Sequence, residues 1–269
     1  MSIDPAIAAF YAHTSEEDRL TGGDGLLEQL RTRELIERHA PAPPGVVLDV
    51  GGAAGVYALW LADRGYTVHL VDASPRLVAE AQRRSDGRLA SCLVGDARQL
   101  EFADSTADVV LLLGPLYHLT AAADRARALA EAHRVLRPGG WLFAAVISRW
   151  ASALDGMARN LLRDERFQSI MERDLAEGQH RNPTARPDYF TTAYFHRPDE
   201  IEAEIKSAGF PDPRLFGIEG PGWLLSDVAE RMSDDGRRSD LMKIARLLES
   251  EPALLGVSAH LLAVAQRPA

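Results

Sequence analysis

The chain has 269 residues, of which 46% are hydrophobic and 26% are charged. This composition is typical of a folded globular protein and excludes global disorder, collagen-like repeats and a coiled-coil rod. The net charge of −9 at pH 7 argues against general binding of DNA or RNA, because phosphate contacts require clustered Lys and Arg side chains.

The cysteine content and the length of the apolar runs exclude further classes of protein. Cys92 is the only cysteine, which excludes an internal disulfide and a cysteine-based zinc site. The sequence contains no convincing cluster of metal ligands, so we expect no metal. No apolar run reaches the roughly 18 residues of a membrane span, and the N-terminal residues lack the pattern of a secretory signal. We therefore expect a cytoplasmic protein that binds neither nucleic acid nor membrane.

The first half of the chain shows alternating strand and helix patterns. Residues 1–44 are predicted to form helices around a glycine-rich loop at 21–25, and the prolines at 41–44 end them. Short apolar runs then predict strands at 46–50, 67–71, 89–94, 108–113 and 141–147, with helices near 57–61, 75–84 and 124–136 between them. This alternation predicts a Rossmann-like, doubly wound α/β fold with a mainly parallel sheet and helices on both faces.

The alternation breaks after the fifth strand. Residues 148–195 have helical character and are too long for an ordinary connection, so we predict a helical insert that acts as a lid. A helix at 198–208 follows, and strands at 214–218 and 260–265 bring the sheet to seven strands. The predicted units are an N-terminal helical cap at 1–44, a cofactor-binding Rossmann-like core at 45–147, the insert at 148–195, and the C-terminal part of the sheet at 196–269.

Three features lie at the carboxyl ends of the first three strands. The small residues at 51–55 allow a ligand to approach free backbone N–H groups, although a simple packing turn would look the same. Asp72 can accept both hydroxyls of a ribose or, alternatively, cap the next helix. Asp96 can receive the amine of an adenine or serve as a turn residue. Because open α/β sheets bind ligands along this edge, the three features together indicate a cofactor that contains adenosine.

The spacing of the glycines distinguishes between such cofactors. A nicotinamide fingerprint, G-x-G-x-x-G, would require glycines where the chain has Ala53 and Val56. The pattern D-x-G-x-x-x-G from Asp49 to Gly55 instead resembles motif I of the class I S-adenosylmethionine (SAM)-dependent methyltransferases. Residues 71–75 are similar to motif II, 95–97 to the acidic motif on the adenine side, 107–119 to the fourth-strand motif, and 131–142 to the helix, turn and fifth strand. The resemblance covers about residues 45–147.

The resemblance implies a set of cofactor contacts and SAM as the cofactor, with S-adenosylhomocysteine (SAH) as the product. Four groups of residues would hold SAM: Asp49, Gly51, Gly52 and Ala53 at the methionine part, Asp72 and Ala73 at the ribose, Asp96 and Ala97 at the adenine, and Leu113, Gly114 and Tyr117 over the cofactor and toward the substrate. The chain departs from the family at Ala53, where glycine is usual. A methyl group there can crowd the carboxylate end of the cofactor.

His118 is the candidate catalytic residue. It follows the fourth strand, and an imidazole with an ordinary pKa near 6.5 can take a proton from an attacking hydroxyl or amine. The alternative is a packing histidine at the start of a helix. Tyr117 can place its ring against the sulfonium, or it can be a half-buried core residue.

The sequence thus predicts a SAM-dependent methyltransferase, of enzyme class EC 2.1.1, that modifies an oxygen or nitrogen of a small molecule by direct displacement. A non-catalytic cofactor-binding scaffold of the same fold is the first alternative, and a nicotinamide-dependent oxidoreductase is the second. The acceptor, and the choice between a monomer and a dimer, stay open.

Overall fold

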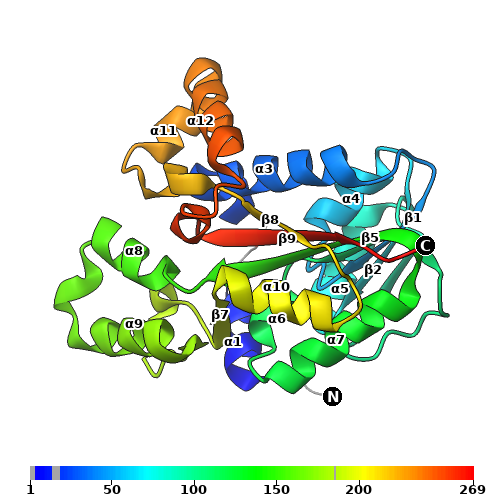
Figure 1. Ribbon diagram of the computed structural model, residues 1–269, viewed down its shortest axis with the longest axis horizontal. Coiled ribbons are helices and arrows are strands. Elements are labelled where there is room, and N and C mark those ends of the chain that lie inside the picture. Colours follow the sequence, from blue (N-terminus) through cyan, green and yellow to red (C-terminus); the bar gives the residue numbers. More distant parts are fainter. Residues whose placement is uncertain (1–3, 14–18, 185) are drawn as a thin grey trace.

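The computed structural model describes residues 4–13, 19–184 and 186–269. These residues form a mixed, mainly parallel sheet with helices on both faces (Figure 1), as predicted. The order of neighbouring strands is β3-β2-β1-β4-β5-β7-β6, while β9 pairs with β5 and β8 pairs with β9. The strands are β1 (Val46–Val50), β2 (Thr67–Asp72), β3 (Ser91–Val94), β4 (Ala107–Leu112), β5 (Leu136–Ser148), β6 (Gln179–His180), β7 (Ala193–His196), β8 (Arg214–Gly217) and β9 (His260–Gln266).

The helices cover the sheet in two layers. Residues of α3, α4 and α5 share one buried cluster with the sheet, whereas those of α6, α7 and α10 share a second cluster on the opposite face. None of the described helices is long and apolar enough to span a bilayer. The α-helices are α1 (Pro5–His13), α3 (Gly23–His39), α4 (Val56–Ala62), α5 (Pro75–Ser85), α6 (Pro115–His118), α7 (Ala122–Val135), α8 (Ala151–Ala158), α9 (Glu165–Glu177), α10 (Pro198–Ser207), α11 (Val228–Ser233) and α12 (Asp235–Leu248).

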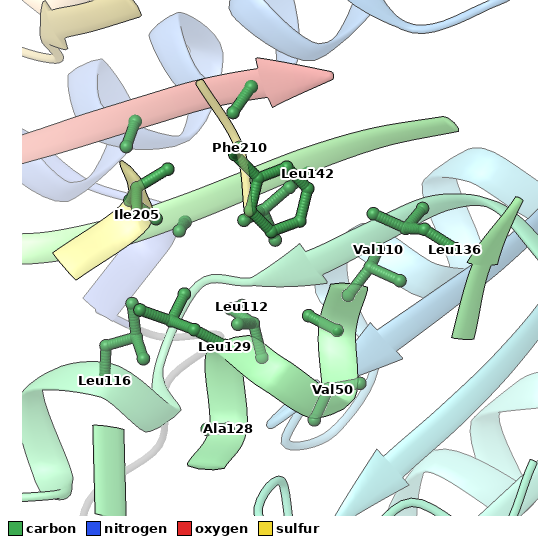
Figure 2. Close-up of a cluster of buried hydrophobic side chains, with 14 of the residues drawn as sticks. Val50, Val110, Leu112, Leu116, Ala128, Leu129, Leu136, Leu142, Ile205 and Phe210 are labelled. Carbon is green, nitrogen blue, oxygen red and sulfur yellow. The ribbon is translucent and has the colours of Figure 1, made fainter. Parts of the chain in front are cut away.

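The second cluster fixes β4 and β5 against α7 and α10. Figure 2 shows Leu112 and Leu142 meeting Leu129, Ile205 and Phe210, and all five side chains are fully buried. Burial of a large apolar side chain contributes about 1.5–3 kcal/mol. The packed layers therefore hold the strand ends, and the loops that follow them, in fixed positions.

The register of the parallel strands brings their carboxyl ends to one edge. Val50 lies opposite Val71 on β2, and Asp72 lies opposite Val94 on β3. Asp49 lies opposite Leu111 on β4. The loops after β1, β2, β3 and β4 are consequently neighbours, although they are far apart in the sequence.

All seven predicted strands are present, but the insert also contains strands. Residues 148–195 form α8 and α9, as their helical character predicts, and then the short hairpin of β6 and β7. β7 runs parallel to the end of β5, with Phe195 opposite Ile147. The fifth strand also begins earlier than predicted, at Leu136, because residues 137–140 form an irregular part of β5 where the register with β4 shifts.

Candidate active site

The loop after β1 is closely packed at its glycines. The N–H groups of Gly51 and Gly52 both donate to the carbonyl of Val71, at 2.7 and 3.3 Å, and draw the loop onto β2. A Cβ atom at Gly51, whose φ is 77°, would lie 2.6 Å from the ring of Pro115 on α6. Glycine at this position therefore allows the loops after β1 and β4 to meet.

Asp49 presents a buried carboxylate without a full set of donors. Its side chain is 1% exposed, and Oδ2 has no hydrogen-bond partner among the described residues. Burial raises the pKa of Asp49 to about 7, and the charge of Asp72 adds to this effect. Because a buried acceptor is normally paired, Asp49 is suited to a cationic donor bound beside it. The ammonium group of a methionine moiety fits this requirement.

Asp72 connects the loops after β1 and β2. One carboxylate oxygen accepts the N–H of Ala53 at 2.9 Å, and the other accepts the N–H of Ser74 at 2.8 Å. Burial raises the pKa of Asp72. The carboxylate thus has a structural role in turning the chain into α5, whose first turn is capped by Ser74. It also lines the cavity described below, so the structural role and the predicted ribose contact are compatible.

Asp96 is held by an arginine that the sequence analysis did not select. Arg98 pairs with Asp96 at 2.6 Å and with Asp124 on α7 at 2.9 Å. The hydrogen bonds from Arg98 hold the pKa of Asp96 below its usual range. This bridge joins the end of β3 to α7 and fixes the orientation of the Asp96 carboxylate. The spacing of Arg98 and Asp124 in the sequence carries no signal for their contact.

His118 lies between two other segments of the chain. Its Nδ1 is 3.2 Å from the carbonyl of Thr192 in the insert, and its Nε2 is 2.9 Å from the hydroxyl of Tyr11 on α1. A carbonyl only accepts, so Nδ1 carries the proton and the neutral ring receives the Tyr11 proton at Nε2. Burial lowers the pKa of His118 to about 4, although the Thr192 hydrogen bond and Asp4 oppose this shift.

One cavity of about 620 Å³ joins these groups. Its volume is in the range of small-molecule and cofactor sites. The residues that the sequence selected as cofactor-binding or catalytic all line it: Asp49, Gly51, Gly52, Ala53, Asp72, Ala73, Asp96, Ala97, Leu113, Gly114, Tyr117 and His118. The structure therefore brings the whole predicted set together, in an enclosure of suitable size for SAM.

The N-terminal helix α1 forms one wall of this cavity. Ile7, Ala8 and Tyr11 line it, and Arg76 on α5 donates to the backbone carbonyl of Tyr11. The sequence predicts a helical cap here, but it carries no signal for these contacts. Arg31 on α3 does not line the cavity: it is fully buried and pairs with Glu34 and Glu249.

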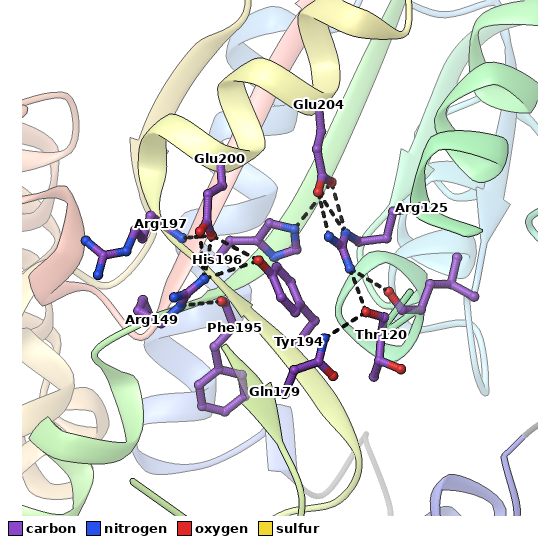
Figure 3. Close-up of polar contacts among 11 residues, drawn as sticks. Thr120, Arg125, Arg149, Gln179, Tyr194, Phe195, His196, Arg197, Glu200 and Glu204 are labelled. Carbon is purple, nitrogen blue, oxygen red and sulfur yellow. Dashed lines mark hydrogen bonds and ion pairs between the residues drawn. The ribbon is translucent and has the colours of Figure 1, made fainter. Parts of the chain in front are cut away.

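A buried polar network supports the opposite rim. Figure 3 shows Arg125 between Glu204 and Thr120. Arg125 also donates to the carbonyl of Leu119, and its guanidinium carbon is 3.9 Å from the centre of the Tyr194 ring. Gln179 donates to the carbonyl of Thr120 at 3.1 Å. His196 contacts Glu204 at 3.4 Å and is fully buried. The network holds the rim residues Leu119 and Thr120, which line the cavity.

One group of possible metal ligands lies outside this cavity's lining. Among the described residues, Glu28, Glu219 and His260 approach one another closely enough to share an ion. Glu28 pairs with Arg19, and Glu219 pairs with His260 at 2.6 Å. The carboxylates already have cationic partners from the protein, so the group is an ion-pair cluster.

Comparisons with known proteins identify the family of this chain. A family model described as "Methyltransferase domain" matches residues 48–144. An uncharacterized methyltransferase of Mycobacterium bovis is 31% identical over 225 residues, which are 82% of this chain and 80% of that protein. The ubiquinone/menaquinone biosynthesis C-methyltransferase UbiE of Acidiphilium cryptum is 35% identical over 130 residues, and the match covers 46% of this chain and 50% of the relative. The chain thus spans about half the length of that relative.

A solved structure shows the same fold. Phosphoethanolamine N-methyltransferase 2 of Haemonchus contortus, in complex with phosphomonomethylethanolamine and SAH, superimposes with a TM-score of 0.57 at 19% identity. The superposition covers 90% of this chain and 53% of that chain. The sequence match to the mycobacterial relative extends over most of both proteins, and the predicted motif residues line one cavity. The chain belongs to the family of SAM-dependent methyltransferases, enzymes of class EC 2.1.1 that use SAM and release SAH.

Proposed function

We propose that the chain methylates a hydroxyl oxygen or an amine nitrogen of a small-molecule acceptor. The observation that carries this proposal is the Tyr11–His118 pair, in which a phenol donates to a neutral imidazole beside the predicted cofactor residues. When bound, SAM supplies a methyl group already activated by its sulfonium. The protein then has to bind and align the acceptor, exclude water and accept one proton.

The proton path follows from the tautomer of His118. The proton of the attacking group passes to the oxygen of Tyr11, while the Tyr11 proton passes to Nε2 of His118. The imidazole becomes a cation, and the proton later leaves to water. Because burial lowers the pKa of His118 to about 4, the ring is neutral at pH 7 and can accept the Tyr11 hydrogen bond at Nε2. Acceptors that carry an O–H or N–H group fit this path directly.

We propose that the predicted residues divide the cavity into four parts. We assign the methionine part to Asp49 and the loop at 51–53, the ribose to Asp72 and Ala73, and the adenine to Asp96 and Ala97. Leu113, Gly114 and Tyr117 then face the acceptor. The cover formed by α1 supports a small acceptor, because a folded macromolecule would have to displace this helix. The negative net charge supports the same choice over nucleic acid, and we propose the cytoplasm as the compartment.

Calorimetric titration tests the cofactor assignment. We expect SAM and SAH to bind with dissociation constants in roughly the micromolar range and NAD to show no heat. Asp72→Ala should remove most of this binding in a folded protein, whereas Tyr66→Phe, whose hydroxyl contacts Pro41 away from the cavity, should not. Binding of NAD alone would overturn the assignment. SAM binding without transfer to any acceptor would favour the scaffold alternative.

Transfer of a labelled methyl group tests the proton path. With an acceptor found by screening phenols, alcohols and amines, Tyr11→Phe and His118→Gln should each lower kcat by about 100-fold or more. Both should weaken SAM binding far less than they lower kcat, because each removes only one of the contacts of α1. Equal kcat in the two variants and the wild type would eliminate the path. A product methylated on carbon, as the name of the UbiE relative suggests for that protein, would replace the proposed acceptor atoms.

A further inference from the structure

Phe190 has a backbone conformation that side chains rarely adopt. Its φ is 63° and its ψ is −166°, a region populated almost exclusively by glycine and costing about 1–3 kcal/mol for other residues. Such a conformation persists only where the surrounding structure imposes it. Phe190 lies in the insert, between the 3-10 helix Pro187–Tyr189 and β7.

The side chain of Asn182 holds this strained turn. Its amide nitrogen donates to the carbonyl of Phe190 and to the carbonyl of Arg186, both at 2.8 Å. Its amide oxygen accepts from the N–H of Thr184 at 3.0 Å and from the Thr184 hydroxyl at 2.6 Å. One side chain thus connects four groups of the turn and fixes the direction in which Phe190 leaves it.

The strained conformation of Phe190 brings two groups of the insert into contact with the imidazole of His118. The ring of Phe190 stacks on His118, with centroids 6.0 Å apart and an angle of 26° between the planes. Two residues later, the carbonyl of Thr192 accepts the Nδ1 proton of His118. Phe190 also meets the ring of Phe10 on α1 edge-on, at 5.3 Å. The turn therefore contacts both the histidine and the helix that supplies Tyr11.

We propose that Asn182, Phe190 and Thr192 are positioning residues that hold His118 in its Nδ1–H tautomer with Nε2 directed at Tyr11. This inference rests on the proposed function only where it calls His118 the proton acceptor, since the tautomer and its cause are properties of the protein alone. The insert then has a role beyond covering the cavity. It also sets the tautomer of a histidine that lines the cavity.

The charged and titratable neighbours of His118 set the direction of the expected effect. Tyr11 faces it from α1, Asp4 lies just before this helix, and Tyr117 touches it on α6 with ring centroids 4.7 Å apart. The insert contributes an uncharged ring and a carbonyl. Loss of the Phe190 ring admits water to the imidazole, and the pKa of His118 should rise from about 4 toward its usual value.

Histidine-labelled NMR measures tautomer and pKa directly and needs no methyl acceptor. In the full chain with SAH added, we expect His118 to show the Nδ1–H tautomer and a midpoint well below that of exposed histidines. Phe190→Gly removes the ring but suits the backbone conformation, so the variant should fold. It should raise the midpoint by about one pH unit or more, and Asn182→Ala should act in the same direction. Phe190→Tyr, which keeps the ring, should retain the wild-type midpoint.

Asn160→Ala is the matched control, because Asn160 is an asparagine of the same insert with a positive φ of 60°. It should leave both the tautomer and the midpoint unchanged. A wild-type tautomer and midpoint in folded Phe190→Gly and Asn182→Ala would overturn the inference. Failure of the proposed function is separate: it would appear as absence of methyl transfer while this titration still behaves as expected.

Discussion

Ala53 combines a strained backbone with a place in the cofactor loop. Its φ is 47°, in the left-handed region, and its N–H donates to Asp72. An L-residue with a side chain costs roughly 1–2 kcal/mol in this region, which glycine avoids. Glycine also has more conformational freedom in the unfolded chain, and this freedom offsets about 0.4–1 kcal/mol of the stability gained by relieving the strain. We expect Ala53→Gly to raise the free energy of unfolding by up to about 1 kcal/mol and to tighten SAM binding several-fold.

The neighbouring residue provides the control for this prediction. Ala54 is buried at 5% exposure and is not among the residues with a positive φ. Ala54→Gly should therefore lower the free energy of unfolding, since it adds freedom to the unfolded chain without relieving strain. Urea unfolding and calorimetric titration of both variants make the comparison. A loss of stability and of SAM affinity in Ala53→Gly would show that the methyl group is neither strained nor in the way.

The sequence predicts best those site residues that lie at or just after the carboxyl end of a strand. Asp49, Asp72 and Asp96 each lie at or just after a short apolar run, and parallel strands bring those positions to one edge. The contact of Tyr11 with His118 spans 107 positions, and no local pattern indicates it. Thr192 acts through its backbone carbonyl, which every residue possesses. For these reasons the residues at the strand ends can be predicted from the sequence, but the partners that set the tautomer and pKa of His118 cannot.

At the scale of elements, Tyr11 connects α1 to the rest of the described chain through hydrogen bonds. Arg76 on α5 donates to the carbonyl of Tyr11, and the Tyr11 hydroxyl donates to His118. Ile7 is the buried residue of this helix. We expect Arg76→Ala to loosen α1 by about 1 kcal/mol, which should raise amide hydrogen exchange in residues 5–13. The rate of SAM release should rise several-fold with it.

Arg83→Ala is the matched control, because Arg83 is an exposed arginine on the same helix and does not line the cavity. It should change neither the exchange of α1 nor the release rate, which stopped-flow measurements with SAM can follow. If Arg76→Ala releases SAM at the wild-type rate while α1 exchanges faster, the helix does not control access to the cofactor. The covering role assigned to α1 would then be wrong.

The elements that sequence reasoning missed are short and depend on distant partners. β6 has two residues and β7 has four, so neither shows a period-2 pattern long enough to read. Both exist because β7 pairs with the end of β5, which is a long-range contact. The other seven strands of the sheet, in contrast, follow apolar runs bounded by turn residues. Long-range strand pairing determines where the strands of the insert form, whereas the local hydrophobic pattern is enough to predict the strands of the core.

At the scale of the whole molecule, an ion-pair cluster joins the two ends of the chain. Glu28 on α3 pairs with Arg19, while His260 at the start of β9 lies 2.6 Å from Glu219 and 3.7 Å from Glu28. Ser258 donates to the second carboxylate oxygen of Glu219 at 2.6 Å. The cluster therefore fixes the N-terminal helical region against the last strand of the sheet.

The pKa shifts in this cluster predict how stability depends on pH. Burial opposes the charge of His260, but Glu28 and Glu219 outweigh it and raise its pKa from 6.5 to about 9. Because folding raises the pKa of His260, its protonated ring contributes stability that is fully present below pH 6.5 and is lost as the pH rises through about 9. Glu28 behaves oppositely: Arg19 and His260 outweigh burial and lower its pKa to about 2, so its contribution is lost only in strong acid.

Between about pH 7 and pH 10 the wild type should therefore lose on the order of 1–3 kcal/mol of unfolding free energy through His260. His260→Gln should be less stable at neutral pH and should show a flatter profile over the same interval. His13→Gln, at an exposed position on α1, should keep the wild-type slope. Urea unfolding at a series of pH values measures all three. Parallel profiles for the wild type and His260→Gln would mean that His260 is not a cation in the folded chain, and Glu219 would then lack a cationic partner, whereas Glu28 would keep Arg19.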